Sequence, residues 1–237
     1  MAFDLTEALA ERGWTLTAAE REAFDRYYRL LVAWNERVNL TAITDPEGVA
    51  LKHFYDSLTP AFHVDFSGIS SLVDIGSGAG FPGLPLKLRF PHLALTIVDS
   101  LKKRITFLEE AVRQLGLTGV TLIHGRAEAV GRDPAHRERY DMAIARAVAR
   151  LNVLSELCLP FVRVGGLFVA MKGADVEEEV QEAQTALATL GGALERIERF
   201  TLPANGGGRT LLFIAKRAPT PSAYPRKPGV PEKKPLR

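Results

Sequence analysis

The sequence predicts an α/β protein with a doubly wound, mostly parallel sheet, and three features of the chain support this fold class. After Ser70, short apolar segments alternate with amphipathic helical segments, as in repeated strand–helix–strand units. The first apolar segment runs directly into a glycine-rich turn between Gly76 and Gly80. Only residues 203–209 separate the last two apolar segments, which is too short for a crossover helix, so these segments are expected to form an antiparallel hairpin.

The apolar segments predict seven strands. Their expected ranges are 72–75, 95–99, 120–124, 141–145, 167–171, 194–200 and 210–215. The clearest helix spans residues 102–115, because Ile105, Leu108 and Val112 fall on one face and Gly116 is a stop signal. The prediction is therefore a seven-stranded sheet that is parallel except for its C-terminal hairpin.

About 65 residues precede the first strand, and two helical segments are predicted there. Thr17 and Glu20 have the spacing of a capping box, and apolar residues follow at helical intervals. Asp45 and Pro46 have the pattern of an N-cap followed by a proline in the first helical position. This N-terminal helical layer is expected to complete the core, to form a cap that faces the substrate, or to do both.

We therefore divide the chain into a helical layer packed on the domain (1–66), the main domain (67–217) and a basic, proline-rich tail (218–237). The 237 residues are 46% hydrophobic, which is enough for one large core. No apolar run is long enough to cross a bilayer, the N-terminus lacks the features of a signal peptide, and Cys158 is the only cysteine. These features predict a cytoplasmic protein that does not bind a membrane.

The tail concentrates positive charge. Residues 224–237 contain five basic residues and one acidic residue, whereas the whole chain has a net charge of only +2. Such a segment is too poor in apolar residues to fold alone, so it is expected to be an extended, cationic arm that is either a contact for nucleic acid or a solubilising terminus.

The glycine-rich turn predicts a nucleotide-type cofactor site. Asp74 comes just before the glycines, and Asp99 ends the next predicted strand, where a carboxylate can accept hydrogen bonds from ribose hydroxyls. Gly78, Gly80 and Gly83 match the spacing of a dinucleotide site, so NAD is one interpretation. The positions of the two acids and the terminal antiparallel strand fit S-adenosylmethionine more closely. A turn without a ligand is the third interpretation.

Nearly the whole chain resembles one family, the bacterial small-subunit rRNA guanine-N7 methyltransferase G, also called glucose-inhibited division protein B. The resemblance implies a class I S-adenosylmethionine-dependent methyltransferase fold and the formation of 7-methylguanosine in a decoding-region loop of 16S rRNA. It also implies a link to streptomycin resistance. The matching segments are 34–43, 53–58, 73–86, 126–128, 145–149, 171–173 and 224–229.

With this resemblance, the expected partners are S-adenosylmethionine and 16S rRNA or the small ribosomal subunit, and we expect a monomer. Asp99 would accept from the ribose, and Ala127 and Glu128 would read the adenine edge. Arg146, at the exit of the fourth strand, would contact both cofactor and RNA. The full set of predicted cofactor-binding residues is Gly76, Gly78, Phe81, Asp99, Ser100, Leu101, Ala127, Glu128 and Arg146.

Methylation of guanine N7 requires little acid–base chemistry, because N7 has an exposed lone pair and no proton to lose. We therefore predict no catalytic base, and expect alignment of the reactants to dominate. Cys158 lies in an apolar helical run and is expected to be core. His53 and Asp56 are expected to shape a pocket or to form a structural pair rather than to bind a metal. Lys172 either meets phosphate or is solvated.

Two other functions are consistent with parts of the sequence. An NAD-dependent oxidoreductase would use the same glycine turn, but no recognisable hydride-transfer constellation follows it. A non-catalytic ribosome-assembly module would hold the cofactor without using it, and only a product assay separates this function from methyl transfer.

Overall fold

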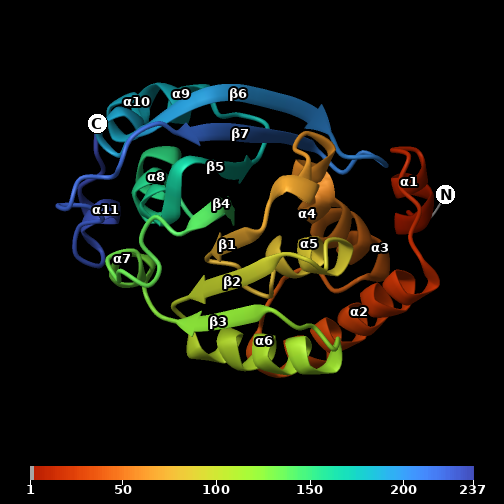
Figure 1. Ribbon diagram of the computed structural model, residues 1–237. Coiled ribbons are helices and arrows are strands. Elements are labelled where there is room, and N and C mark those ends of the chain that lie inside the picture. Colours follow the sequence, from red (N-terminus) through yellow and green to blue (C-terminus); the bar gives the residue numbers. More distant parts are fainter. Residues whose placement is uncertain (1–2) are drawn as a thin grey trace.

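The computed structural model describes residues 3–237, and one seven-stranded sheet forms its centre (Figure 1). The strand order is β3-β2-β1-β4-β5-β7-β6. Strands β1 to β5 pair in parallel, and β7 is antiparallel to both β5 and β6. The seven predicted strands and the C-terminal hairpin are confirmed. The bounds are β1 (Ser71–Ile75), β2 (Ala94–Asp99), β3 (Val120–His124), β4 (Tyr140–Arg146), β5 (Val162–Lys172), β6 (Gly192–Thr201) and β7 (Gly208–Lys216).

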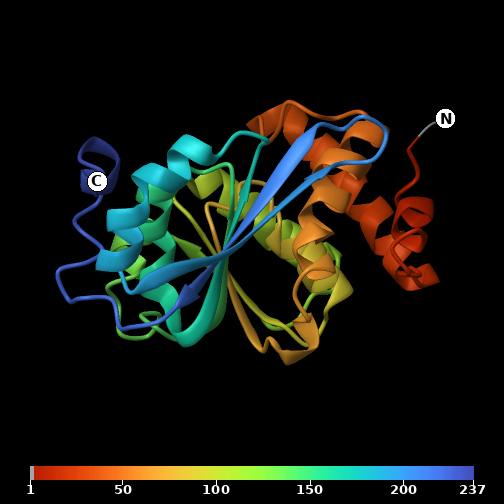
Figure 2. The same ribbon diagram turned by 90° about the horizontal axis from the view of Figure 1, so that it is seen from above.

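Helices cover both faces of the sheet (Figure 2), and each face has its own hydrophobic core. One face packs against α1 (Leu5–Ala10), α2 (Ala18–Val38), α3 (Pro46–Val49), η1 (Ala50–Tyr55), α4 (Asp56–Leu58), η2 (Thr59–Phe62), η3 (Phe66–Gly68), α5 (Gly83–Arg89) and α6 (Lys102–Gln114). The other carries α7 (Ala127–Val130), α8 (Leu151–Cys158), η4 (Leu159–Phe161), α9 (Glu177–Glu182), α10 (Gln184–Thr189) and α11 (Val230–Lys233). The sheet is therefore doubly wound, as the alternation of segments predicts.

The N-terminal helical layer completes the first core and reaches the glycine turn. The predicted capping box is present, because the Thr17 hydroxyl accepts from the Glu20 amide and the Glu20 carboxylate accepts from the Thr17 amide. Phe24, Tyr27 and Leu31 are buried on one side of α2. The Tyr27 hydroxyl donates to the Ala79 carbonyl at 2.5 Å. This hydrogen bond ties the layer to the turn after β1.

The second predicted helix begins as expected but does not continue as a regular α-helix. The Asp45 carboxylate accepts from the Gly48 amide at 2.6 Å and caps α3. A π-helix, η1, then follows before α4. An apolar pattern this short cannot distinguish α-helical from π-helical turns, so η1 could not be predicted from it. Wide turns of this kind often occur at functional sites, and η1 contains His53.

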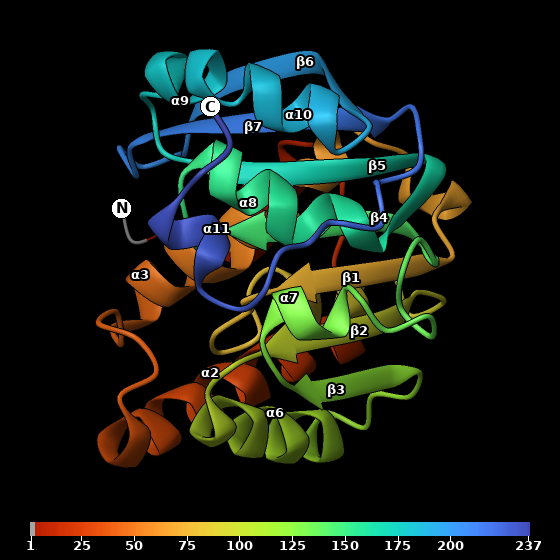
Figure 3. The same ribbon diagram turned by 90° about the vertical axis from the view of Figure 1, so that its left-hand side faces the viewer.

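The tail is not an extended arm. It folds back along α7 and α8, as Figure 3 shows for the blue segment that ends in α11. Tyr224 packs against the second core, and Pro225 and Pro231 are buried. A composition poor in apolar residues prevents independent folding, but it does not prevent packing on a finished domain. The prediction that the tail extends from the domain is therefore wrong.

Candidate functional site

Three cavities meet at the edge of the sheet where the parallel strands end, which is the usual ligand edge of such sheets. The loop cavity, about 440 Å³, lies along the glycine turn from Gly76 to Ala79. The tail cavity, about 190 Å³, lies between Ala127 and the C-terminal segment. The arginine cavity, about 560 Å³, is lined by Arg146 and other polar side chains. Val148, in the loop after β4, lines all three cavities.

The glycines of the turn have different roles. Gly76, Gly78 and Gly80 all have positive φ, at 71°, 64° and 97°, which side chains disfavour. A Cβ atom on Gly80 would lie 2.5 Å from the Tyr27 hydroxyl, so this glycine is required by packing. A Cβ atom on Gly78 would meet no protein atom within 4 Å. The space beside Gly78 is therefore open to a ligand.

Asp99 is buried and is held by the glycine turn. Its Oδ2 atom accepts from the Gly78 amide at 3.0 Å and from Arg104 at 3.3 Å. Its Oδ1 atom accepts from the Leu101 amide at 2.9 Å. A carboxylate has about four acceptor positions, so Asp99 retains capacity for a ligand donor in the loop cavity.

Two polar atoms beneath the turn are buried without a partner among the described residues. They are the second carboxylate oxygen of Asp74, Oδ1, and the hydroxyl of Ser77. Asp74 Oδ2 accepts from the Gly83 amide at 2.7 Å, and burial raises the pKa of the carboxyl to about 7. Ser77 lines the loop cavity. The Ser77 hydroxyl lowers the pKa of the Asp74 carboxyl, against the effect of burial, so the two groups lie close to each other beneath the turn.

The predicted adenine-contacting residues line the tail cavity, with one exception. Ser100, Ala127 and Glu128 all lie on its wall. Leu101 is 42% exposed and lines none of the three cavities. Its backbone amide instead holds Asp99, as described above.

Phe81 lies at the centre of an aromatic stack beside the loop cavity. The His53 ring is stacked on it with centroids 4.5 Å apart, and the Arg146 guanidinium lies 5.3 Å from its centroid. Thr41 Oγ1 is 2.8 Å from His53 Nε2. Burial, reinforced by the charge of Arg146, lowers the pKa of His53 to about 4. The imidazole is therefore neutral near pH 7.

Two arginines converge on one buried carboxylate in the arginine cavity. Arg146 Nη1 lies 3.2 Å from Asp56 Oδ2, and Arg209 Nε lies 3.1 Å from Asp56 Oδ1. Arg146 also donates to the Lys52 carbonyl. His53 and Asp56 thus shape the site through Arg146 and do not pair with each other. The cluster has a surplus of positive charge beside an open cavity.

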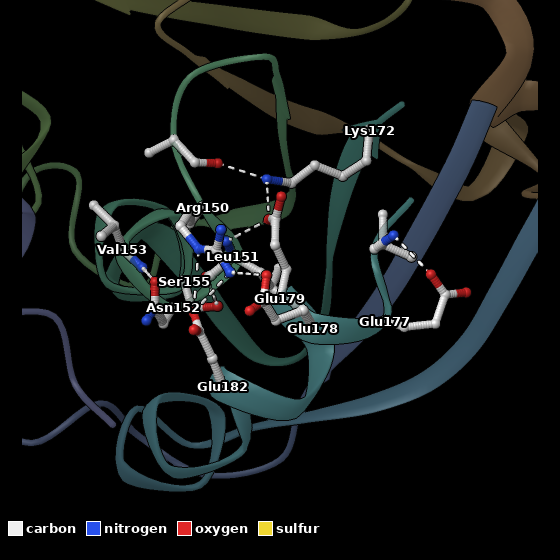
Figure 4. Close-up of polar contacts among 12 residues, drawn as sticks. Arg150, Leu151, Asn152, Val153, Ser155, Lys172, Glu177, Glu178, Glu179 and Glu182 are labelled. Atoms are coloured by element: carbon white, nitrogen blue, oxygen red, sulfur yellow. Dashed lines mark hydrogen bonds and ion pairs between the residues drawn. The ribbon is translucent and has the colours of Figure 1, made fainter. Parts of the chain in front are cut away.

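Lys172 is mostly buried and is already paired within the protein. Only 8% of its side chain is exposed, and its Nζ atom donates to the Ala149 carbonyl at 2.5 Å and to Glu179 at 2.6 Å (Figure 4). Glu179 also accepts from the Leu151 amide at 2.8 Å. Lys172 therefore ties the loop after β4 to α9. The interpretation of Lys172 as a solvated lysine is therefore wrong. A contact with phosphate stays a prediction, because Lys172 also lines the arginine cavity.

Cys158 is fully buried in the second core, as predicted, and burial raises the pKa of its thiol. Within residues 3–237, no group of three or more His, Cys, Asp and Glu side chains is placed to hold a metal ion. No helix in that range is long and apolar enough to cross a membrane.

Sequence reasoning missed two residues of this edge. Arg209 follows the glycine-rich turn of the β6–β7 hairpin, which was interpreted only as a connection. Glu156 is a fully buried acid in the apolar helix α8, and it pairs with Arg226 of the tail. A lone acid in an apolar helical run indicates a basic partner elsewhere in the chain, because acidic residues are rarely buried without one.

Comparisons with known proteins agree on one family. The model of the family described as rRNA small subunit methyltransferase G matches residues 20–205. The chain is 56% identical to the Ribosomal RNA small subunit methyltransferase G of Halalkalibacterium halodurans, over 98% of both chains. It is 53% identical to the protein of the same name in Bacillus subtilis, also over 98% of both chains.

Solved structures with low sequence identity share the fold. A 16S rRNA (adenine(1408)-N(1))-methyltransferase from Catenulisporales acidiphilia matches with a TM-score of 0.52 at 17% identity, over 64% of this chain and 87% of that chain. The YcgJ protein of Bacillus subtilis matches with a TM-score of 0.53 at 14% identity, over 70% of this chain and 100% of that one. The predicted class I methyltransferase fold is confirmed.

Proposed function

Because the chain belongs to the rRNA small subunit methyltransferase G family, we propose that it transfers a methyl group from S-adenosylmethionine to N7 of a guanine in a decoding-region loop of 16S rRNA. The observation that carries this proposal is the open space beside Gly78, next to a buried carboxylate that the same turn holds in place. A family match supplies the class of reaction, and this geometry supplies a place for the methyl donor.

The residues present fit S-adenosylmethionine. The methionine part would lie along the glycine turn, where Ser77 lines the loop cavity. The ribose hydroxyls would donate to Asp99, and the adenine ring would occupy the tail cavity beside Ala127 and Glu128. When bound, this cofactor supplies a methyl group on a positively charged sulfur, which is already a good leaving group.

The arginine cavity is the proposed place of the guanine, because it joins the loop cavity at His53, Arg146 and Val148. Arg146 and Arg209 together hold ten N–H donors, and only some of them are used on Asp56. Arg146 also donates to the Lys52 carbonyl and Arg209 to the Gly208 carbonyl, and the donors not used in these hydrogen bonds are available to the carbonyl oxygen of the base or to the flanking phosphates. Asp56 in turn fixes both guanidinium groups, so that they are positioned before RNA arrives.

The chain's own contribution to the reaction is positioning. N7 attacks through its lone pair, so no side chain needs to remove a proton before methyl transfer. His53, with its pKa near 4, adds no positive charge beside the base as the base becomes cationic. Alignment of the base with the donor accounts for most of the rate that these residues supply.

The test is a product assay. The purified protein is incubated with labelled S-adenosylmethionine and with either naked 16S rRNA or assembled small subunits, and the nucleosides are mapped by mass. We expect 7-methylguanosine at one position. Cofactor binding without any methylated nucleoside in either RNA substrate would favour the assembly module. Binding of NAD without S-adenosylmethionine would favour the oxidoreductase.

A further inference from the structure

The C-terminal segment, which is the tail defined above (218–237), is held on the domain by side chains from the connection between α7 and β4. The Arg132 side chain donates to the Pro225 carbonyl at 2.6 Å and to the Ala223 carbonyl at 2.8 Å. Arg137 donates to the Tyr224 carbonyl at 2.7 Å and to Thr220 O at 2.6 Å. Both arginines belong to the connection between α7 and β4. The segment therefore follows a defined path over the domain.

A buried ion pair anchors the middle of this segment. Glu156 of α8 is fully buried, and its carboxylate accepts from Arg226 at 2.6 Å and 2.9 Å and from the Arg226 backbone amide at 2.7 Å. A buried carboxylate needs such partners, and breaking a pair of this kind is strongly destabilising. Arg226 is thus a fixed point, three residues before the part of the segment that reaches the cofactor edge.

That part of the segment contacts the proposed adenine pocket directly. The Gly229 amide donates to Glu128 Oε1 at 2.8 Å, and Gly229 has a φ of 81°, which favours glycine. Within residues 3–237, the second oxygen of Glu128, Oε2, accepts no hydrogen bond. Only 3% of Glu128 is exposed. One oxygen therefore accepts from the tail at 2.8 Å and from Arg126 at 3.4 Å, and the other has no protein partner among the described residues.

The tail also forms one wall of the same cavity. Pro231 and Glu232 line the tail cavity together with Ser100, Ala127 and Val153 of the domain. Pro231 is buried, whereas Pro228 is exposed. The wall is built by a segment that lies 101 positions from Glu128 along the chain, so no local motif could have indicated it.

We propose that the C-terminal segment is part of the cofactor site, where Gly229 holds Glu128 in position to accept from the exocyclic amine of adenine and Pro231 closes the cavity over the ring. This inference rests on the proposed function, because it takes the adenosine part of S-adenosylmethionine as the occupant. Gly229 and Pro231 act as positioning residues. The basic composition of the tail is then secondary to its role at the cavity.

The first experiment measures binding of S-adenosylhomocysteine and of its inosine analogue, which lacks the exocyclic amine, by calorimetry. Full-length protein is compared with a chain that ends at Pro228, which keeps the Arg226–Glu156 pair. We expect the truncation to weaken S-adenosylhomocysteine binding about 10-fold or more and to reduce the preference for adenine over inosine. A merely structural role would lower the melting temperature and leave this preference unchanged.

Two single substitutions keep the test valid if the truncated chain does not fold. Pro231→Ala removes part of the wall, and Pro228→Ala is the matched change at an exposed proline of the same segment. We expect about 3-fold to 10-fold weaker binding for the first and no change for the second. Equal effects of the two substitutions on binding would overturn the proposal.

Trypsin gives an independent readout, since it can cut after Arg226 and Lys233 in this segment. We expect S-adenosylhomocysteine to slow the loss of the tail from the full-length protein. If full-length protein does not bind S-adenosylhomocysteine, the proposed function itself fails. If the full-length protein and the truncated chain bind S-adenosylhomocysteine equally well, the inference fails. In that case, a salt dependence of RNA binding that is flatter in the truncated chain, by about 0.7 per lost phosphate contact, would show that the tail serves RNA.

Discussion

The two halves of the ligand edge are built in different ways. At β1 and β2, the site consists of backbone amides and one carboxylate, Asp99, within a turn that contains three positive-φ glycines. At β4 and β7, it consists of long charged side chains, Arg146 and Arg209, which meet on Asp56. In the proposed function, the first half holds the adenosylated donor. The second half has donors that can suit one base and its phosphates.

This difference indicates where selectivity resides. A backbone cradle is rigid and tolerates little change at its glycines, whereas a side-chain cluster can be altered without disturbing the sheet. Changes in the glycine-turn half should therefore abolish cofactor binding. Changes at Arg209, which of the three cavities lines only the arginine cavity, should affect RNA and leave the cofactor in place.

The largest effect is expected for Gly78→Val. The side chain would fill the open space beside the turn, so cofactor affinity should fall on the order of 100-fold or more. Gly116→Val is the matched control, because Gly116 has the same φ of 64° and equally open surroundings at the end of α6. Both substitutions should cost about 1 to 2 kcal/mol of stability through backbone strain. Calorimetry and thermal melts check this; equal cofactor affinities in the two variants would exclude the glycine turn as the site.

Asp99→Ala should weaken cofactor binding by about 1.5 to 3 kcal/mol, the loss expected for charge-assisted hydrogen bonds. Asp141→Ala is its control. Asp141 also accepts from backbone amides, those of Ser70 and Ser71, but it lies at the N-terminal ends of the parallel strands, away from the proposed ligand. The control should lower the melting temperature without changing cofactor affinity. Titration calorimetry separates the two outcomes, and unchanged affinity in a folded Asp99→Ala protein would contradict the assignment to the ribose.

The same contrast explains what the sequence could predict. The glycine turn, Asp74 and Asp99 follow one another along two adjacent strands, so chain order alone brings them together. Asp56 lies 90 positions from Arg146 and 153 from Arg209, and only the completed sheet brings them into contact. Arg146 was expected at this edge because β4 was predicted correctly. No local sequence pattern indicated that Asp56 binds Arg146, or that Arg209 lies at the same place.

The tail shows the limit of reasoning from composition. Five basic residues near the C-terminus indicated an arm for nucleic acid, because counting charges ignores their partners. Glu156 neutralises Arg226, and the carbonyls of the tail are satisfied by Arg132 and Arg137. Apolar residues were few, but polar contacts with a finished domain supplied the missing stabilisation.

In the arginine half, Arg209→Ala should lower kcat/KM for 16S rRNA about 10-fold, since it removes donors from the cavity and leaves Asp56 with one partner. Cofactor affinity should stay within about a factor of two. Arg199→Ala, on the neighbouring strand, removes an exposed pair with Glu177 and should change neither quantity. Steady-state kinetics and calorimetry on both variants are the measurements. A larger loss of cofactor affinity than of rRNA turnover would mean that the two halves are not separate.

A separate prediction concerns the pH dependence of stability at His53, whose pKa falls from 6.5 to about 4 on folding because of burial and the nearby Arg146. The unfolded chain therefore binds this proton more readily, so the stabilising contribution is fully present above about pH 6.5 and is lost as the pH falls through about 4. The full shift corresponds to roughly 3 kcal/mol. In His53→Gln, the free energy of unfolding should fall less between about pH 7 and pH 4.5 than in the unmodified protein. Asp74, whose raised pKa acts with the opposite sign, is present in both proteins and cancels in the comparison. Urea titrations at both pH values provide the measurement, and an identical fall in the two proteins would show that His53 is not held in its neutral form by the arginine half of the site.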